Sequence, residues 1–294
     1  MMQSGLINVL KPPGMTSHDV VAYIRRLYGL KRVGHAGTLD PAAAGVLPVF
    51  VGNATRLVEY LADADKSYRA ELTFGFETDT GDDTGQIIQS RPYNRPQLSQ
   101  IEAALASFIG VSEQIPPMYS AVKIAGKKLY ELARAGQVVE RKARTIVIEK
   151  LVLVTEAESG LVFDVKCSKG TYIRTLCADI ARRLDCLAVM SFLVRTRVGS
   201  FCLEQSLTLE EITANKEQAL QAADTALTHI PAVILSEQEA QAVKNGRSIC
   251  CRQSGADLVR MYDRQQNFLG IGRETGQSEE RTMLIPVKIL SPDR

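Results

Sequence analysis

The strict alternation of side chains over residues 67–76 is the feature that most constrains the fold. Apolar or aromatic residues occupy every second position, and mostly polar residues occupy the positions between them. Alternate side chains of an extended chain point to opposite faces. The segment therefore predicts a β-strand with Tyr68, Ala70, Leu72, Phe74 and Phe76 on one face and Ser67, Arg69, Glu71 and Thr73 on the other.

The other predicted elements follow in an irregular order. Apolar segments predict strands over residues 6–10, 46–51, 145–154, 161–167 and 188–198. Helices are predicted from Ser17, as N-cap, to Tyr28 with Gly29 at the C-terminal end, after Asn53, over 99–109 and from 173 to 184. Thr208 and Glu211 fit a capping box at the start of another helix. Strands dominate without βαβ alternation, which predicts an α+β fold. After Pro231, short strands and glycine-rich turns predict a small β-rich domain, so the domain limits are 1–230 and 231–294.

Composition excludes several classes of protein. With 294 residues, 45% of them hydrophobic and 23% charged, the chain has an ordinary globular composition. A net charge of +2 does not indicate a polyanionic partner, although a local basic surface could still bind one. No apolar stretch is long enough to span a bilayer, and the N-terminus lacks the charged region of a signal peptide. A cytoplasmic protein with reduced cysteines is expected. The histidines lack metal-ligand spacing, so no metal site is predicted.

Three loop segments carry polar residues that packing does not require, namely 34–41, 66–69 and 168–174. Asp40, between a glycine-rich stretch and Pro41, suits either a nucleophile or an ordinary Asp-Pro turn. If the segments converge, they gather a carboxylate, two aromatic rings and several cations. The set is Asp40, His35, Lys66, Tyr68, Lys169, Tyr172 and Arg174.

Taken singly, most of these residues also have a structural explanation. Tyr68 suits the core, His35 suits a turn, and Arg174 suits a surface ion pair. Together they suit chemistry on a planar ring, because a carboxylate paired with an arginine can attack or stabilise charge while aromatic rings stack. Basic segments at Arg25–Arg26, Lys31–Arg32, Lys127–Lys128 and 141–144 would hold phosphates. The combination predicts a site for a base turned out of an RNA stack.

Six longer segments stand out over residues 5–200. They are KPPGMTSHDVV (11–21), VGHAGTLDPAAAGVLPV (33–49), DKSYRAELTFGFETDTGDDTG (65–85), QIPPMYSAVKIAGKKLYELARAG (114–136), CSKGTYIRTLCADI (167–180) and FLVRTRVGSF (192–201). In their order and spacing, these segments resemble the bacterial tRNA pseudouridine-55 synthases, the TruB family.

The resemblance implies an isomerase that converts uridine 55 in the T-loop of tRNA to pseudouridine, without a cofactor or metal. It implies a mixed, largely antiparallel sheet with flanking helices. Asp40 matches the catalytic aspartate, which attacks either C6 of the uracil or C1′ of the ribose. Tyr68 matches the aromatic residue that stacks on the flipped base and assists removal of the C5 proton. Arg174 matches the arginine that pairs with the catalytic carboxylate.

Further residues match substrate-binding positions of the family. His35 matches a histidine that helps to hold bases flipped out, Tyr172 and Leu193 line the nucleoside pocket, and Lys11 matches a motif lysine with a structural role. Residues 116–144 correspond to a mobile thumb that closes on the RNA, and 231–294 to a PUA-like RNA-binding domain. The expected partner is the T-arm of tRNA, bound by a monomer that needs no protein partner.

Two rival functions remain open from the residues. A non-catalytic tRNA-binding or chaperone protein with the same fold would be expected to lose the carboxylate or its arginine, and this chain has both. A methyltransferase with a cysteine nucleophile would need a methyl-donor loop, which is not evident.

Overall fold

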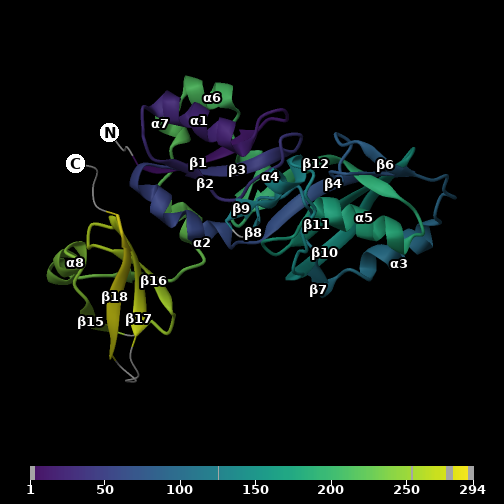
Figure 1. Cartoon of the computed structure of the whole chain (residues 1–294). Coiled ribbons are helices and arrows are strands. Elements are labelled where there is room, and N and C mark those ends of the chain that lie inside the picture. The colour runs from purple at the N-terminus through teal and green to yellow at the C-terminus, as the bar shows by residue number, and fades with distance from the viewer. Residues whose placement is uncertain (1–3, 125, 253, 276–280, 291–294) are drawn as a thin grey trace. The chain divides into compact units, whose positions relative to one another are not determined.

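The computed structural model describes residues 4–124, 126–252, 254–275 and 281–290 (Figure 1). The chain forms two compact units. The first unit takes in the described parts of residues 1–41, 46–62 and 199–294, and the second unit comprises residues 42–45 and 63–198. None of the described helices is long and apolar enough to cross a membrane.

The second unit is built on a sheet whose strands follow the order β12-β4-β11-β10-β7. These neighbours are all antiparallel, whereas Ala44 and Gly45 at the start of β3 pair with β12 in parallel. The mixed, largely antiparallel sheet is therefore confirmed. The strands are β3 (Ala44–Val51), β4 (Lys66–Phe74), β7 (Gly110–Gln114), β10 (Arg144–Ala157), β11 (Gly160–Cys167) and β12 (Ala188–Val198).

Strand β4 confirms the predicted alternation. Ala70, Leu72 and Phe74 are buried, and Arg69 on the opposite face is exposed. The strand ends earlier than predicted, because Gly75 adopts a φ of 105° and separates β4 from β5 (Phe76–Thr78). Strand β5 then pairs with β6 (Ile87–Ser90) in a small sheet of its own.

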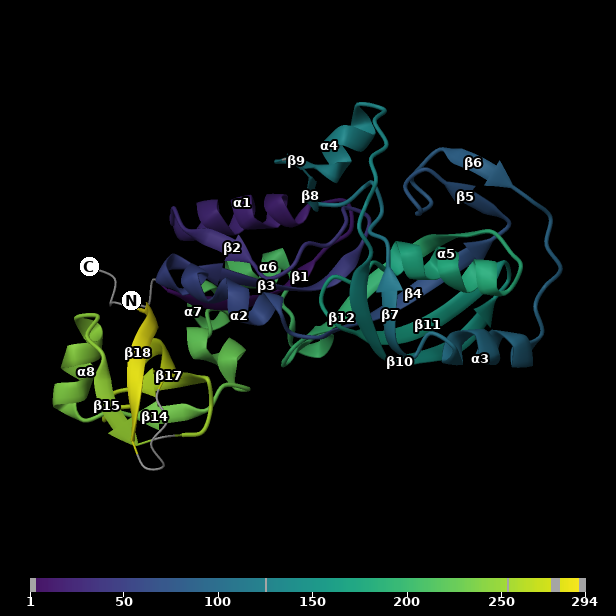
Figure 2. The ribbon, with the colours of Figure 1, turned by 60° about the horizontal axis from the view of Figure 1, so that its bottom comes forward.

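Two helices cover the apolar face of this sheet, as Figures 1 and 2 show. Helix α5 (Ile173–Arg183) packs on β12 and β4, and helix α3 (Leu98–Ala106) packs on β10 and on α5. Helix α5 buries Ile173, Leu176 and Ile180, which is the helical spacing predicted from the sequence. Its first turn also places Arg174 toward the interior.

The described part of residues 116–144, the thumb segment, contains two very short strands and one short helix. These are β8 (Lys123–Ile124), β9 (Lys127–Lys128) and α4 (Leu129–Arg134). Gly126 and Gly136 have positive φ angles of 83° and 71°. Such φ angles favour glycine at both positions, and pivoting of the thumb segment at these glycines stays a prediction.

The first unit begins with β1 (Gly5–Lys11), α1 (Ser17–Tyr28) and β2 (Val33–His35), and β2 pairs with the later part of β3. Thr16, rather than the predicted Ser17, caps α1, because Thr16 and Asp19 form a reciprocal capping box. Gly29 ends the helix in the left-handed conformation, as predicted. The unit continues with η1 (Gly52–Leu57), α2 (Val58–Ala62), β13 (Phe201–Cys202), η2 (Leu203–Gln205), α6 (Leu209–Ala214), α7 (Lys216–Ala219) and η3 (Ala223–Leu227).

The C-terminal part is rich in strands, as predicted after Pro231. Its five-stranded sheet has the order β14-β16-β17-β18-β15 and packs around its own apolar cluster, which includes Val243, Val259 and Leu284. The elements are β14 (Ala232–Ile234), α8 (Glu237–Lys244), β15 (Ile249–Arg252), β16 (Leu258–Tyr262), β17 (Phe268–Thr275) and β18 (Arg281–Ile289). The boundary at residue 231 and the PUA-like description stay predictions.

Candidate active site

Asp40 lies in a loop whose two flanking residues are tied to the first unit. The Ser17 hydroxyl, at the start of α1, accepts a hydrogen bond from the Leu39 N–H at 2.9 Å and donates one to the Leu39 carbonyl at 3.2 Å. Ser17 is only 2% exposed, so water hardly competes for these bonds. The residue before Asp40 is therefore fixed by helix α1.

The residue after Asp40 is tied to the end of β1. The Pro41 carbonyl accepts hydrogen bonds from the Gly14 N–H at 2.8 Å and from Lys11 Nζ at 3.2 Å. Lys11 is completely buried and also donates to the Pro12 carbonyl at 2.9 Å. These contacts tie Lys11 to the backbone that follows β1 and to the residue after Asp40. Asp40 itself is half-buried, between two anchored neighbours.

His35 ends the short strand β2, where it pairs with Val49 of β3. Its side chain is half-buried in the first unit. The two-residue turn after it includes Ala36, whose N–H donates to the Pro48 carbonyl at 3.0 Å. His35 is thus held on the strand that leads into the Asp40 loop.

Tyr68 and Leu193 lie on the apolar face of the sheet in the second unit. Tyr68 on β4 pairs with Arg195 on β12, and Ala70 pairs with Leu193 two residues away on each strand. Tyr68 is half-buried, whereas Leu193 is 7% exposed. The pairing brings an aromatic ring and an aliphatic side chain to one part of the same face, which suits a planar base.

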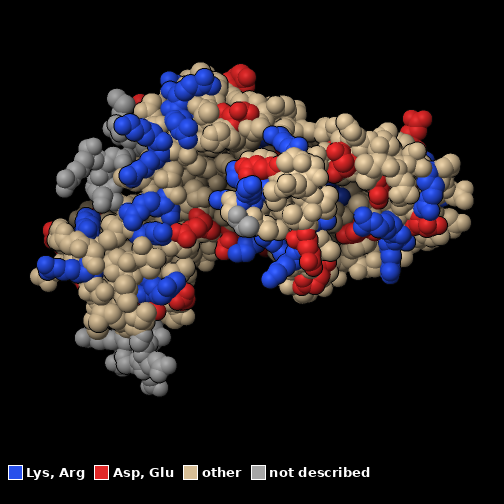
Figure 3. All heavy atoms as spheres, viewed as in Figure 1, with Lys and Arg blue, Asp and Glu red and all other residues tan. Residues whose placement is uncertain are grey.

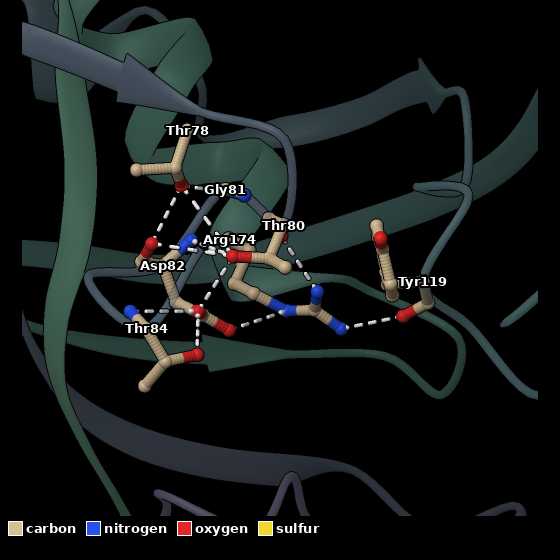
Figure 4. Close-up of polar contacts among 7 residues, drawn as sticks. All are labelled: Thr78, Thr80, Gly81, Asp82, Thr84, Tyr119 and Arg174. Carbon is tan, nitrogen blue, oxygen red and sulfur yellow. Dashed lines mark hydrogen bonds and ion pairs between the residues drawn. The ribbon is translucent and has the colours of Figure 1, made fainter. Parts of the chain in front are cut away.

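Arg174 is buried, so the surface ion pair considered from the sequence is wrong. Its guanidinium donates to the Thr80 carbonyl at 2.7 Å and to the Tyr119 carbonyl at 2.8 Å (Figure 4). The carboxylate of Asp82 lies 4.0 Å from Arg174 Nε. Arg174 and Asp82 are 6% and 9% exposed, so their attraction is weakly screened.

Asp82 is a functional candidate that sequence reasoning missed. Its Oδ1 accepts hydrogen bonds from the hydroxyls of Thr80 at 2.7 Å and Thr84 at 2.6 Å (Figure 4). The turn TDTGDDTG (78–85) therefore holds a carboxylate toward an arginine. The sequence signal that could have identified Asp82 is the pair of threonines beside it, because threonine hydroxyls favour such local hydrogen bonds.

Tyr172 is fixed at the start of α5 by a buried amide. The Tyr172 N–H donates to Gln114 Oε1 at 2.7 Å, and Gln114 Nε2 donates to the Tyr172 carbonyl at 3.2 Å. A cavity of about 560 Å³ lies in the second unit near Arg174, between the base of the thumb segment, the β5–β6 region and α5. Lys169, by contrast, pairs with Asp63 at the surface.

The predicted residues thus form two groups, with Asp40, His35 and Lys11 in the first unit and Tyr68, Tyr172, Arg174 and Leu193 in the second.

The buried cysteines do not provide an activated nucleophile. All six are free thiols in the described part of the chain, and burial raises the pKa of Cys167 to about 11. Burial also raises the pKa of Cys177. A neutral buried thiol is a poor nucleophile, which disfavours the methyltransferase alternative. Within the described residues, no group of three or more His, Cys, Asp or Glu side chains could hold a metal ion.

Three family models match the chain. Residues 25–173 match the N-terminal domain of the TruB family pseudouridylate synthases. Residues 174–235 match the C-terminal domain of tRNA pseudouridylate synthase B, and residues 231–279 match the C-terminal model of pseudouridine synthase II TruB.

Curated relatives are similar over most of their length. A tRNA pseudouridine synthase B of Caldanaerobacter subterraneus subsp. tengcongensis is 48% identical, covering 94% of this chain and 97% of that protein. The Moorella thermoacetica protein of the same name is 43% identical, with coverages of 98% and 100%. Among solved structures, a Cbf5-Nop10-Gar1 complex matches with a TM-score of 0.77 and 29% identity, covering 99% of this chain and 86% of that one.

Proposed function

Because the chain belongs to the TruB family of pseudouridylate synthases, we propose that it converts uridine 55 in the T-loop of tRNA to pseudouridine. The family assignment makes it an isomerase, and tRNA is the class of RNA in the names of its relatives. The observation that carries the proposal is the fixed backbone of the loop around Asp40. Bonds to Leu39 and Pro41 fix the backbone on both sides of a half-buried carboxylate.

The chemistry needs no other reactant because its atoms balance within the substrate. The N1–C1′ bond breaks, the base turns, and a C5–C1′ bond forms. C5 then loses a proton and N1 gains one. Asp40 assists this exchange by attack on C6 of the ring or by action at C1′, directly or through a glycal intermediate. A stiff loop keeps the carboxylate in position for either route.

The second unit supplies the groups that would handle the base. Tyr68 stacks on the ring, and its phenol oxygen assists removal of the C5 proton. Leu193 and Tyr172 line the nucleoside pocket, and Arg174 supplies a cation for the catalytic carboxylate. Extrusion of a base costs a few kcal/mol. Stacking on one aromatic ring returns about 1–3 kcal/mol.

Basic side chains would contribute the remaining affinity through phosphate contacts. In Figure 3, lysines and arginines gather over the part of the first unit that contains α1 and α7. Arg25 and Arg26 lie in the last turn of α1, and Lys216 lies in α7. Phosphate contacts of this kind make RNA affinity fall with rising salt concentration.

The remaining parts of the proposal concern RNA grip and context. His35 acts as a wedge that holds T-loop bases apart, and the thumb segment closes on the T-arm. Residues 231–294 form a PUA-like RNA-binding domain, and the family model over residues 231–279 supports a separate C-terminal domain there. We propose a cytoplasmic monomer that acts on tRNA without a protein partner. The non-catalytic alternative is not favoured, because Asp40 and Arg174 are both present.

The direct test is to incubate the pure protein with unmodified tRNA transcripts and to map pseudouridines by sequencing after carbodiimide treatment. A single new pseudouridine at position 55 is expected. A transcript with cytidine at position 55 serves as the matched control and should remain unmodified. Pseudouridine at another position, or none in a transcript that the protein binds, would contradict the proposal.

A further inference from the structure

A nearly completely buried arginine lies beside Tyr68. Arg195, on β12, is 1% exposed and is among the largest fully buried side chains. It is the cross-strand partner of Tyr68 on β4, and its guanidinium hydrogen-bonds to the Tyr68 side chain. Since a guanidinium can only donate, the phenol oxygen of Tyr68 is the acceptor.

A buried cation needs a reason, because an apolar side chain of similar volume would pack there at lower cost. Burial lowers the pKa of Arg195, and the interaction with Tyr68 opposes this effect. Arginine nevertheless stays protonated in proteins. The contact therefore places a permanent positive charge next to the phenol oxygen.

The backbone that carries Arg195 is held from both sides. Strand β4 pairs with it at Tyr68, and the start of β3 pairs with it at Gly45. A Cβ added to Gly45 would lie 2.2 Å from the Arg195 carbonyl oxygen, so the two backbones are in close contact. Arg195 is consequently a rigidly mounted donor, which suits a positioning role.

The charge of Arg195 also acts on a second side chain of this face. Lys66 precedes Tyr68 by two residues on β4 and is 7% exposed. Burial first, and then the charge of Arg195, lower the pKa of Lys66 to about 8. This part of the face is therefore electropositive, and Tyr68 is its aromatic member.

We propose that Arg195 is a positioning residue for Tyr68. Arg195 holds the phenol oxygen of Tyr68 and stabilises the phenolate that removes the C5 proton. The inference rests on the proposed function and adds a residue to it. In this step the phenolate takes the C5 proton and becomes a phenol. The electron pair of the C5–H bond forms the C5–C6 double bond. The C6–N1 π pair then moves to N1, which takes a proton from solvent. If Asp40 is bonded to C6, the C6–O bond breaks instead and returns its pair to the carboxylate.

The test measures single-turnover pseudouridine formation in T-loop RNA for Arg195→Met, Arg195→Lys, Tyr68→Phe and the double variant Tyr68→Phe/Arg195→Met. Arg195→Met should slow the reaction by about 100- to 1000-fold, as loss of one preorganised donor does in other enzymes. RNA affinity should stay within a few-fold. Arg195→Lys retains a cation and should recover part of the rate. It also provides the measurement if the methionine variant does not fold.

Two readouts separate positioning from a merely structural role. With 5-deuterated uridine at the target position, the Arg195 variants should show a larger primary isotope effect, because C5 proton removal becomes rate-limiting. In the Tyr68→Phe background, Arg195→Met should cost little more, because the hydroxyl is already absent. Arg69→Met is the matched control, because Arg69 adjoins Tyr68 but is exposed and pairs with Asp164 on the opposite face.

The outcomes distinguish this inference from the proposed function. If the unsubstituted protein forms no pseudouridine 55, the proposed function fails. If that protein is active, fully active Arg195 variants or an unchanged isotope effect would overturn the inference alone. The same holds if the rate losses of Arg195→Met and Tyr68→Phe are additive in the double variant.

Discussion

At the scale of single residues, Arg174 and Asp82 form a buried contact between opposite charges. Packing alone does not require charged side chains there. Arg174 lies near the start of α5, where the helix dipole disfavours a cation. Two carbonyl groups and the Asp82 carboxylate offset that cost. Removing the charge of Asp82 should therefore disturb Arg174 without changing the shape of the turn.

We expect Asp82→Asn to slow pseudouridine formation about 10- to 100-fold, because hydrogen bonds and contacts to charged groups contribute about 1.5–3 kcal/mol. Affinity for tRNA should change little. The rate can be measured by tritium release from tRNA labelled at C5 of uridine. Asp83→Asn is the matched control, because Asp83 is exposed beside it. Equal rates for the two variants would argue against the role of Asp82.

Lys66 provides a prediction about pH. Its pKa is lowered to about 8 in the folded protein from an ordinary value of 10.5, so the unfolded chain binds more protons between these two values. The free energy of unfolding contributed by Lys66 therefore rises with pH from about 8 to 10.5. Below pH 8 the full cost of the buried charge is present.

Lys66→Met should accordingly be more stable than the unsubstituted protein near pH 7, and this advantage should shrink between pH 8 and 10.5. Urea denaturation of both proteins at several pH values measures the difference. Buried thiols on which Lys66 has no influence, such as Cys177, also have a raised pKa, which acts in the opposite direction; their contribution is the same in both proteins and cancels. An advantage that is constant with pH would show that Lys66 is not buried as a cation.

The sequence predicted functional residues where the neighbouring residues form a segment that resembles the family. Asp40, Tyr68 and Arg174 belong to such segments, and their catalytic roles stay predictions. Asp82 and Arg195 also lie in segments that resemble the family, but they were missed as functional candidates because folding determines the partners of their side chains. Strand register places Arg195 opposite Tyr68, and the docking of α5 brings Arg174 to Asp82. No local pattern encodes either pairing.

At the scale of elements, the junction between β3 and β12 is unusually sensitive. Gly45 has a φ of 114°, and a Cβ there would lie 2.2 Å from the carbonyl oxygen of Arg195. Only glycine accommodates both conditions. Gly45 follows Asp40 by five residues, so this junction also ends the loop that carries Asp40.

Gly45→Ala should lower the free energy of unfolding by about 3 kcal/mol or more, because it combines a strained φ with a clash against backbone. Thermal and urea denaturation measure the loss. Gly136→Ala is the matched control, because Gly136 has a φ of 71° but nothing within 4 Å of an added Cβ. It should lose only about 1–2 kcal/mol. A similar loss in both variants would contradict the close contact at the junction.

Most elements could be predicted because side-chain period and capping residues are local signals. Strand β12 has the predicted limits, and Thr208 caps α6 with Glu211 as expected. The errors occurred where two local signals compete. Thr16 and Ser17 are both good caps, and the reciprocal bond with Asp19 selects Thr16. Gly75 interrupts an alternation that otherwise continues to Phe76.

At the scale of the whole molecule, each compact unit combines segments that are distant in sequence. Strand β3 begins in the second unit and continues in the first, and residues after 198 return to the first unit. The sequence pattern changes most clearly at Pro231, whereas the units exchange chain at other positions. Composition therefore does not reveal that each unit combines separate segments. Such an arrangement depends on long-range strand pairing, for which a single sequence carries no signal.

The central claim is that Asp40 is the carboxylate around which the isomerisation of a T-loop uridine is organised. The most direct measurement compares the unsubstituted protein with Asp40→Asn for pseudouridine at position 55 and for tRNA affinity. The amide preserves the size of the side chain and removes its charge. The account predicts no detectable pseudouridine from Asp40→Asn and tRNA binding within a few-fold of the unsubstituted protein. Full isomerase activity in Asp40→Asn would contradict it.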